Sequence, residues 1–183
     1  MKKLIYIIIG VIAAGFFAGC NDDANKTTWE KYTDWRNTNK TWYAEQEALT
    51  NPDGSAYYVR VTPSWNPSAT ILMHWFNDRS ETEGNLTPML TSTVETYYKG
   101  RLYNDEIFDS TASGASYTSQ VSTGIDGWKI ALMNMRVGDS CRVVMPYQQG
   151  YGASANGDIP PYSMLQFDLR LVDITAYEIR PVK

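Results

Sequence analysis

An alternation of apolar and polar residues near the C-terminal end of the chain constrains its fold more than any other feature. The apolar positions are Leu165, Phe167, Leu169 and Leu171, and the residues between them are polar. Because successive side chains of a strand point to opposite faces, this period of two predicts an antiparallel strand with one buried face. The only good helical pattern in this half of the chain runs from Trp128 to Met135. Strands around one short helix indicate an α+β fold.

The N-terminal half is expected to add one helix and two strands. Thr27 and Glu30 have the spacing of a capping box, and aromatic residues then recur at helical spacing until the Pro- and Gly-containing turn at 51–54. This aromatic stripe is most simply a packing face; the alternative is an arm that forms a homodimer or grips a client polypeptide. Strands are predicted over 57–61 and 69–76, and the second is expected to be covered on both faces.

Residues 1–19 have the layout of a secretory signal and are not expected to belong to the fold. Two lysines precede an apolar run of 15 residues, which is shorter than the roughly 20 residues of a membrane-spanning helix. The run ends in Phe17-Ala18-Gly19-Cys20, which resembles the lipobox of bacterial lipoproteins. The resemblance implies an acylated Cys20 on a tether over 20–26. It places the protein in the bacterial cell envelope, at the outer membrane, facing either the periplasm or the outside.

The remaining composition excludes several classes of function. Without 19 of its 183 residues the chain keeps 164, and loss of two lysines takes its formal charge from −4 to −6. Such an acidic chain is not expected to bind nucleic acid. Cys141 has no partner for an intramolecular disulfide and is predicted to be a buried thiol. His74 is the only histidine, so we expect neither a metal site nor a nucleophile activated by histidine.

The C-terminal half also carries short motifs in a fixed order. They are Thr96-Tyr97-Tyr98-Lys99-Gly100-Arg101-Leu102, Ile107-Phe108-Asp109-Ser110, Ile125-Asp126-Gly127-Trp128, Gly150-Tyr151-Gly152, Ile159-Pro160-Pro161 and the alternating strand from Leu165. This series is similar to the FKBP family of peptidyl-prolyl cis/trans isomerases and covers residues 92 to 174. No motif is specific alone, but together in this order they form a strong signal. The resemblance implies an FKBP-like antiparallel sheet wrapped around one short helix, as a domain over 91–183 after a helix and strand extension over 27–90.

The same resemblance implies a site and a reaction. The reaction is cis/trans isomerisation of Xaa-Pro bonds in proline-containing polypeptide clients, here exported envelope proteins, with no cofactor and no covalent intermediate. An aromatic pocket would favour the twisted amide over the planar one. The implied roles are Trp128 as the floor, Tyr98, Phe108 and Phe167 as walls, Ile159 at one edge, the Tyr151 hydroxyl and the Ile125 N–H as donors, and Asp109 at the rim.

Several positions depart from the family pattern. Gly124 replaces a usual valine and would loosen the backbone that supplies the Ile125 donor. Asp158 stands where an apolar side chain is common, and the 110–124 segment is short, so that only Tyr117 is available to overhang the pocket. These departures support a second hypothesis, in which the chain is a non-catalytic client-binding or assembly lipoprotein. A fold alone does not decide between the two functions.

Overall fold

The computed structural model describes residues 25–177, so the expected signal segment and Cys20 lie outside the described residues. Within this range the chain forms one seven-stranded sheet in which all pairs are antiparallel. The strand order is β1-β2-β6-β7-β3-β4, and β5 also pairs with β3. The strands are β1 Val59–Val61, β2 Ile71–Trp75, β3 Thr93–Arg101, β4 Ile107–Ser110, β5 Tyr117–Gln120, β6 Ser140–Met145 and β7 Leu165–Ala176.

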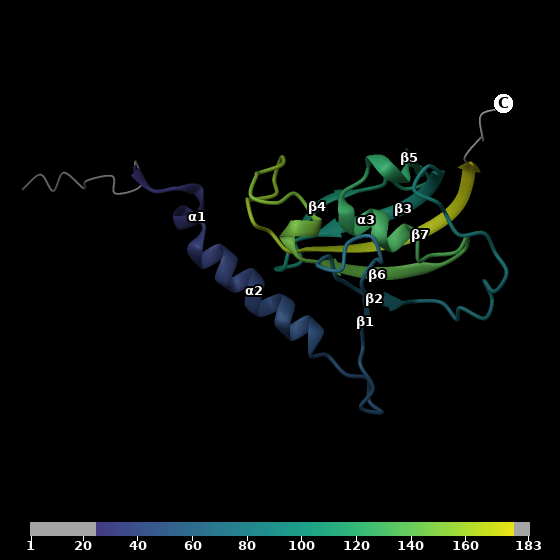
Figure 1. Cartoon of the computed structure of the whole chain (residues 1–183), viewed down its shortest axis with the longest axis horizontal. Coiled ribbons are helices and arrows are strands. Elements are labelled where there is room, and N and C mark those ends of the chain that lie inside the picture. The colour runs from purple at the N-terminus through teal and green to yellow at the C-terminus, as the bar shows by residue number, and fades with distance from the viewer. Residues whose placement is uncertain (1–24, 178–183) are drawn as a thin grey trace, which may run out of the picture.

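The helices lie on the two sides of this sheet (Figure 1). They are α1 Thr28–Lys31, α2 Thr33–Glu47 and α3 Asp126–Leu132, with short 3-10 turns η2 Val121–Thr123 and η3 Tyr147–Gln149. We call α1 and α2 together, residues 28–47, the N-terminal arm. No helix in the described part of the chain is both long and apolar enough to cross a membrane.

The predicted alternating strand is confirmed as β7, which lies at the centre of the sheet between β6 and β3. Its apolar residues Phe167, Leu169 and Leu171 are buried on the side that α3 covers. The helix α3 contributes Trp128 and Ile130 to the same core. The predicted α+β architecture, an antiparallel sheet against one short helix, is therefore confirmed.

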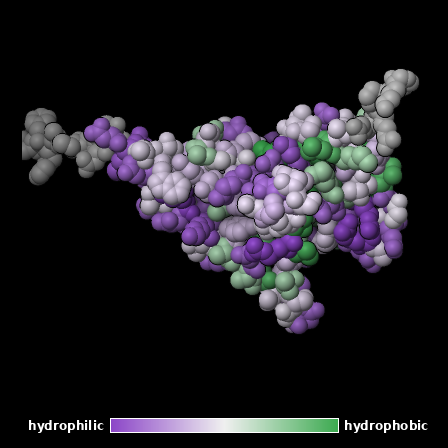
Figure 2. Space-filling model, in the orientation of Figure 1, coloured by the Kyte–Doolittle hydropathy of each residue, from purple (hydrophilic) through white to green (hydrophobic). Residues whose placement is uncertain are grey.

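The N-terminal arm covers part of the opposite face of the sheet. Its predicted capping box is present, because the Thr27 hydroxyl accepts from the Glu30 N–H and the Glu30 carboxylate accepts from the Thr27 N–H. The helix is interrupted at Tyr32, where α1 ends and α2 begins. Further along α2, Trp42 and Tyr43 pack on a second buried cluster. Trp35 packs against the main core, so the middle of the aromatic stripe is a packing face, whereas Trp29 is 50% exposed. The visible surface of the arm is coloured mostly from purple to white in Figure 2.

Strand β2 is covered on both faces, as its sequence pattern indicates. Ile71 and Met73 belong to the core beneath α3, whereas Leu72 belongs to the cluster beneath α2. Because β2 pairs with β6, the expected 27–90 extension and 91–183 domain share one sheet. The loop between β2 and β3 contains the expected boundary. His74 stacks on Tyr57, with 3.8 Å between the ring centroids.

Candidate functional site

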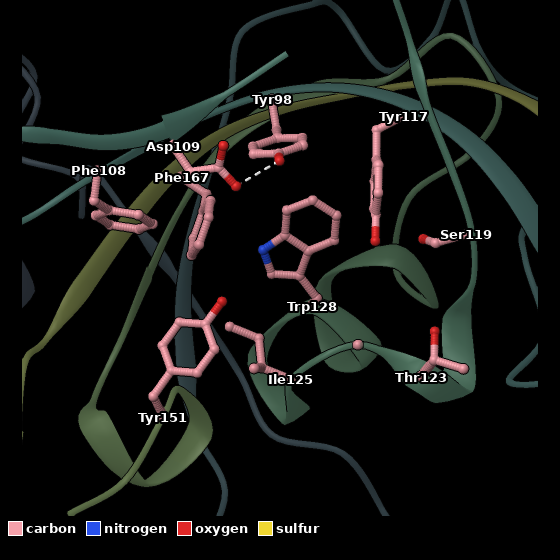
Figure 3. A pocket seen from close by; sticks show the side chains of 11 residues that line it. Tyr98, Phe108, Asp109, Tyr117, Ser119, Thr123, Ile125, Trp128, Tyr151 and Phe167 are labelled. Atoms are coloured by element: carbon pink, nitrogen blue, oxygen red, sulfur yellow. Dashed lines mark hydrogen bonds between the residues drawn. The ribbon is translucent and has the colours of Figure 1, made fainter. Parts of the chain in front are cut away.

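A hollow of about 220 Å³ opens on the α3 side of the sheet (Figure 3). It is formed by side chains from β3, β4, β5, α3, β7 and the turns next to them. The lining residues are Tyr98, Phe108, Asp109, Tyr117, Ser119, Thr123, Gly124, Ile125, Trp128, Tyr151 and Phe167. We call this cavity the hollow.

The floor and walls of the hollow are aromatic rings in edge-to-face contact. Trp128 is only 7% exposed, and its ring centroid lies 5.1 Å from that of Tyr98 and 5.3 Å from that of Phe167. Phe108 meets Phe167 at 5.4 Å with an angle of 84° between the ring planes. Such contacts stabilise the arrangement beyond the burial of the rings. The hollow is therefore a cup whose aromatic walls support one another.

Gly100 on β3 allows these rings to approach the sheet. It lies two residues after Tyr98 and therefore faces the same side. A Cβ atom at this position would lie 2.5 Å from Phe108 Cζ and 2.8 Å from Phe167 Cε1, which is well inside ordinary contact distance. The glycine in this motif is therefore needed for the packing of two walls of the hollow.

The polar groups of the hollow are hydrogen-bond donors and one carboxylate. The Tyr98 hydroxyl donates to Asp109 Oδ2 over 2.6 Å (Figure 3). Burial raises the pKa of Tyr98, and the hydrogen bond to Asp109 raises this pKa further, so the hydroxyl stays protonated. The Tyr151 hydroxyl points into the hollow in Figure 3, and burial raises the pKa of Tyr151 as well.

Two further donors have no partner within the described part of the chain. Trp128 Nε1 is buried without a hydrogen bond, and its nitrogen is turned toward the side on which Phe167 lies (Figure 3). The backbone N–H of Ile125, at the N-cap of α3, makes no intramolecular hydrogen bond. Buried or partly buried donors normally have partners. The Ile125 N–H belongs to a residue that lines the hollow and is available to a carbonyl oxygen there, whereas Trp128 Nε1 is covered by the surrounding protein atoms.

Seven of the eight residues predicted for the site line the hollow, and Ile159 does not. The Ile159 side chain is 4% exposed and belongs to the core. Its backbone forms a bridge with Asn156, so it supports the loop beside the hollow. Asp158, which stands where an apolar side chain is common in the family, is exposed and is not among the lining residues.

The structure adds four lining residues that the site prediction omits: Tyr117, Ser119, Thr123 and Gly124. Tyr117 is the aromatic residue that overhangs the hollow, which is the role that the sequence left open for it. Its ring centroid lies 5.6 Å from that of Tyr98 and 6.4 Å from that of Trp128. Ser119 lies two residues further along β5, so the period of a strand would have placed it beside Tyr117. Gly124 has an ordinary extended conformation with φ −73°, so no left-handed backbone requires a glycine there.

Comparisons with known sequences agree with this geometry. Residues 84–172 match the family model described as FKBP-type peptidyl-prolyl cis-trans isomerase. The chain is 40% identical over 93 residues to the macrophage infectivity potentiator of Trypanosoma cruzi, covering 50% of this chain and 47% of that protein. It is also 40% identical over 83 residues to FK506-binding protein 4 of Chaetomium thermophilum, covering 44% of this chain and 17% of that protein. The chain thus spans less than half the length of these two relatives.

Two solved structures resemble a larger part of the chain. One is the peptidyl-prolyl cis-trans isomerase of Pseudomonas syringae pv. tomato, with a TM-score of 0.64 and 27% identity, covering 79% of this chain and 96% of that one. The other is FkpA from Escherichia coli, with a TM-score of 0.64 and 25% identity, covering 80% of this chain and 62% of that one. The structural similarity therefore extends beyond the residues that the family model matches.

Proposed function

Because residues 84–172 of this chain belong to the FKBP-type peptidyl-prolyl cis-trans isomerase family, we propose that it accelerates cis/trans exchange at Xaa-Pro bonds of polypeptides. The observation that most directly supports the proposal is the hollow itself. It combines an aromatic cup on Trp128 with the Ile125 N–H, a donor that has no partner within the described part of the chain. An apolar cavity with a few converging polar groups is the usual form of a ligand site.

The barrier to this reaction is the resonance of the peptide bond. Rotation costs roughly 18 to 20 kcal/mol, and exchange at Xaa-Pro takes about 10 to 100 s without a catalyst. No nucleophile, metal or redox group is required. A protein accelerates the exchange only if it binds the twisted amide more strongly than the planar one.

The residues of the hollow suit this task. A proline ring on Trp128, between Tyr98 and Phe167, would carry the imide out of water. That transfer weakens the charge separation on which planarity depends. The Ile125 N–H and the Tyr151 hydroxyl would then donate to carbonyl oxygens on either side of the ring. The Tyr98–Asp109 hydrogen bond fixes the Asp109 carboxylate at the rim, next to the aromatic walls.

Exchange spectroscopy by NMR on a short Xaa-Pro peptide tests the proposal. The wild-type chain, as the soluble form from residue 24 onward, should accelerate exchange, and Asp109→Ala and Tyr151→Phe should each reduce the acceleration. Circular dichroism would confirm that all three proteins are folded. No acceleration by the folded wild type, across several residues preceding proline, would overturn the catalytic proposal and favour a client-binding role.

We propose in addition that acylated Cys20 anchors the protein to the bacterial outer membrane and that its clients are exported envelope proteins. The support is the Phe17-Ala18-Gly19-Cys20 sequence, because a diacylated and N-acylated cysteine provides the two or more chains that stable anchoring needs. Metabolic labelling with a fatty acid should mark the wild type and not Cys20→Ala. Equal labelling of both would contradict the anchor.

A further inference from the structure

A buried asparagine on the N-terminal arm needs an explanation that the proposed reaction does not give. Asn39 is 0% exposed, and it is the one fully buried residue of α2. Its Nδ2 donates to the Trp35 carbonyl over 2.9 Å, and its Oδ1 accepts from the Met164 N–H over 2.8 Å. The side chain therefore joins the arm to the residues just before β7.

Trp35 makes a second hydrogen bond across the same contact. Its Nε1 donates to Ser163 Oγ over 3.1 Å. Ser163 Oγ in turn donates to the Pro160 carbonyl over 2.7 Å. Two neighbouring positions of α2, one turn apart, thus hold residues 160–164 through side-chain hydrogen bonds.

Tyr162 directly precedes the two attachment points, Ser163 and Met164, and has a strained backbone conformation. Its φ is +63°, which is uncommon for a bulky residue and costs free energy unless its surroundings enforce it. The Tyr162 ring is in edge-to-face contact with Trp29 of the arm and with Tyr147, at centroid distances of 5.2 Å and 5.4 Å. Arg36 of α2 also lies 5.6 Å from the ring.

The strained residue connects directly to the hollow. The Tyr162 N–H donates to the Gly152 carbonyl over 2.9 Å, and Gly152 follows Tyr151, whose hydroxyl points into the hollow. Residues 153–158 of the intervening loop are exposed. The 150–164 segment is therefore held at its base, where it meets the arm.

We infer that Trp35 and Asn39 are positioning residues, through which the N-terminal arm holds the 150–164 segment so that the Tyr151 hydroxyl points into the hollow. The inference rests on the proposed function, in which Tyr151 donates to a substrate carbonyl. The arm lies outside the family match, which begins at residue 84. The arm therefore holds the 150–164 segment through contacts that residues 84–172 alone do not contain.

A matched pair of substitutions on the same helix tests the inference in the soluble chain from residue 24 onward. Trp35→Phe removes the indole donor that reaches Ser163. Trp42→Phe changes a tryptophan that packs on the second cluster and that, among the described residues, forms no hydrogen bond or ring contact with residues 160–164. We expect kcat/KM for exchange to fall about 3- to 10-fold in Trp35→Phe, because one hydrogen bond is lost. Trp42→Phe should stay within about 1.5-fold of the wild type, since that hydrogen bond is kept.

A double-mutant cycle separates positioning from a general loss of stability. If Trp35 acts through Tyr151, combining Trp35→Phe with Tyr151→Phe should cost little more activity than Tyr151→Phe alone. Asn39→Leu, which leaves the Met164 N–H without its acceptor, should show the same non-additivity. Fully additive losses, or equal losses in Trp35→Phe and Trp42→Phe, would overturn the inference.

A readout that does not depend on activity keeps this test distinct from the test of the reaction. The NMR resonances of the Tyr151 ring, in protein with labelled tyrosine, should shift or broaden in Trp35→Phe and remain unchanged in Trp42→Phe. If the wild type proves inactive but the Tyr151 resonances respond in this way, the proposed function fails and the positioning contact stands. Unchanged Tyr151 resonances in Trp35→Phe would refute the contact itself.

Discussion

Substitution of Gly100 by alanine should damage both the fold and the hollow. The added methyl would lie 2.5 Å and 2.6 Å from two atoms of the Phe108 ring and 2.8 Å from Phe167 Cε1. Carbon atoms in contact are normally about 3.5 to 4.0 Å apart, so two walls of the hollow must move by about 1 Å. Overpacking of this kind costs about 1 to 3 kcal/mol. For a chain of this size, that corresponds to a melting temperature lower by about 2 to 12 °C.

Gly124→Ala is the matched control, because Gly124 lines the same hollow. There the added methyl would lie 3.4 Å from Trp128 Cβ, an ordinary contact, and φ is −73°. A glycine-to-alanine change at a compatible conformation usually stabilises by about 0.4 to 1 kcal/mol. We therefore expect Gly124→Ala to match or exceed the stability of the wild type.

Urea unfolding followed by circular dichroism, together with catalysed exchange at an Xaa-Pro bond, would measure both effects. Gly100→Ala should also lose exchange activity by at least about 10-fold, because a displacement near 1 Å in a reacting geometry can cost about 100-fold. The same unfolding free energy and activity for the two alanine variants would refute the packing argument.

Three further predictions concern single side chains. Tyr98→Phe removes the 2.6 Å hydrogen bond to Asp109 and should lower kcat/KM for Xaa-Pro exchange about 3- to 10-fold with little change in stability; an unchanged rate would show that the carboxylate needs no fixed orientation. Burial would raise the pKa of the Asp168 carboxyl, but hydrogen bonds from arginines, Arg142 foremost, outweigh burial and lower that pKa. Its stabilisation is therefore present above about pH 4 and lost as the pH falls. Urea unfolding of Asp168→Asn should accordingly show a lower free energy at pH 7 and a flatter acid dependence than the wild type, and parallel pH curves would contradict this. Burial raises the pKa of the Cys141 thiol, so peptide mapping after iodoacetamide treatment at pH 8 should find Cys141 alkylated only in urea; rapid alkylation of the native protein would contradict its burial.

The elements that could be predicted from sequence are those whose residue pattern alone indicates the type of element and the face that is buried. The apolar residues of β7 alternate with polar ones, and the face that carries them is buried under α3. The capping box at Thr27 is equally local, because its two hydrogen bonds join residues three apart. In such cases the information for the structure lies within a few neighbouring residues.

The remaining parts depend on partners distant in the chain. Thr123 lies in a polar stretch whose side chains carry no sign that one of them will line a hollow, and Ser119 could be placed there only by its strand spacing from Tyr117. The Ile159-Pro160-Pro161 motif predicts that Ile159 lines the hollow, yet its side chain lies in the core and does not line it. Asn39 lies four residues after Trp35 and three before Trp42, so helical spacing places it on the aromatic face, but nothing in the sequence indicates that its oxygen accepts from a backbone N–H 125 residues later. A single sequence contains no periodic signal for such contacts.

The central claim is that exchange takes place in the hollow, on Trp128. Its buried, unpartnered Nε1–H gives a single NMR resonance that can be followed while a Xaa-Pro peptide is titrated. The exchange cross-peaks of that peptide can be recorded from the same sample. We predict that one peptide concentration half-saturates both the shift of the Trp128 resonance and the catalysed exchange rate. Catalysed exchange without any response of Trp128, or a response of Trp128 without faster exchange, would contradict the claim.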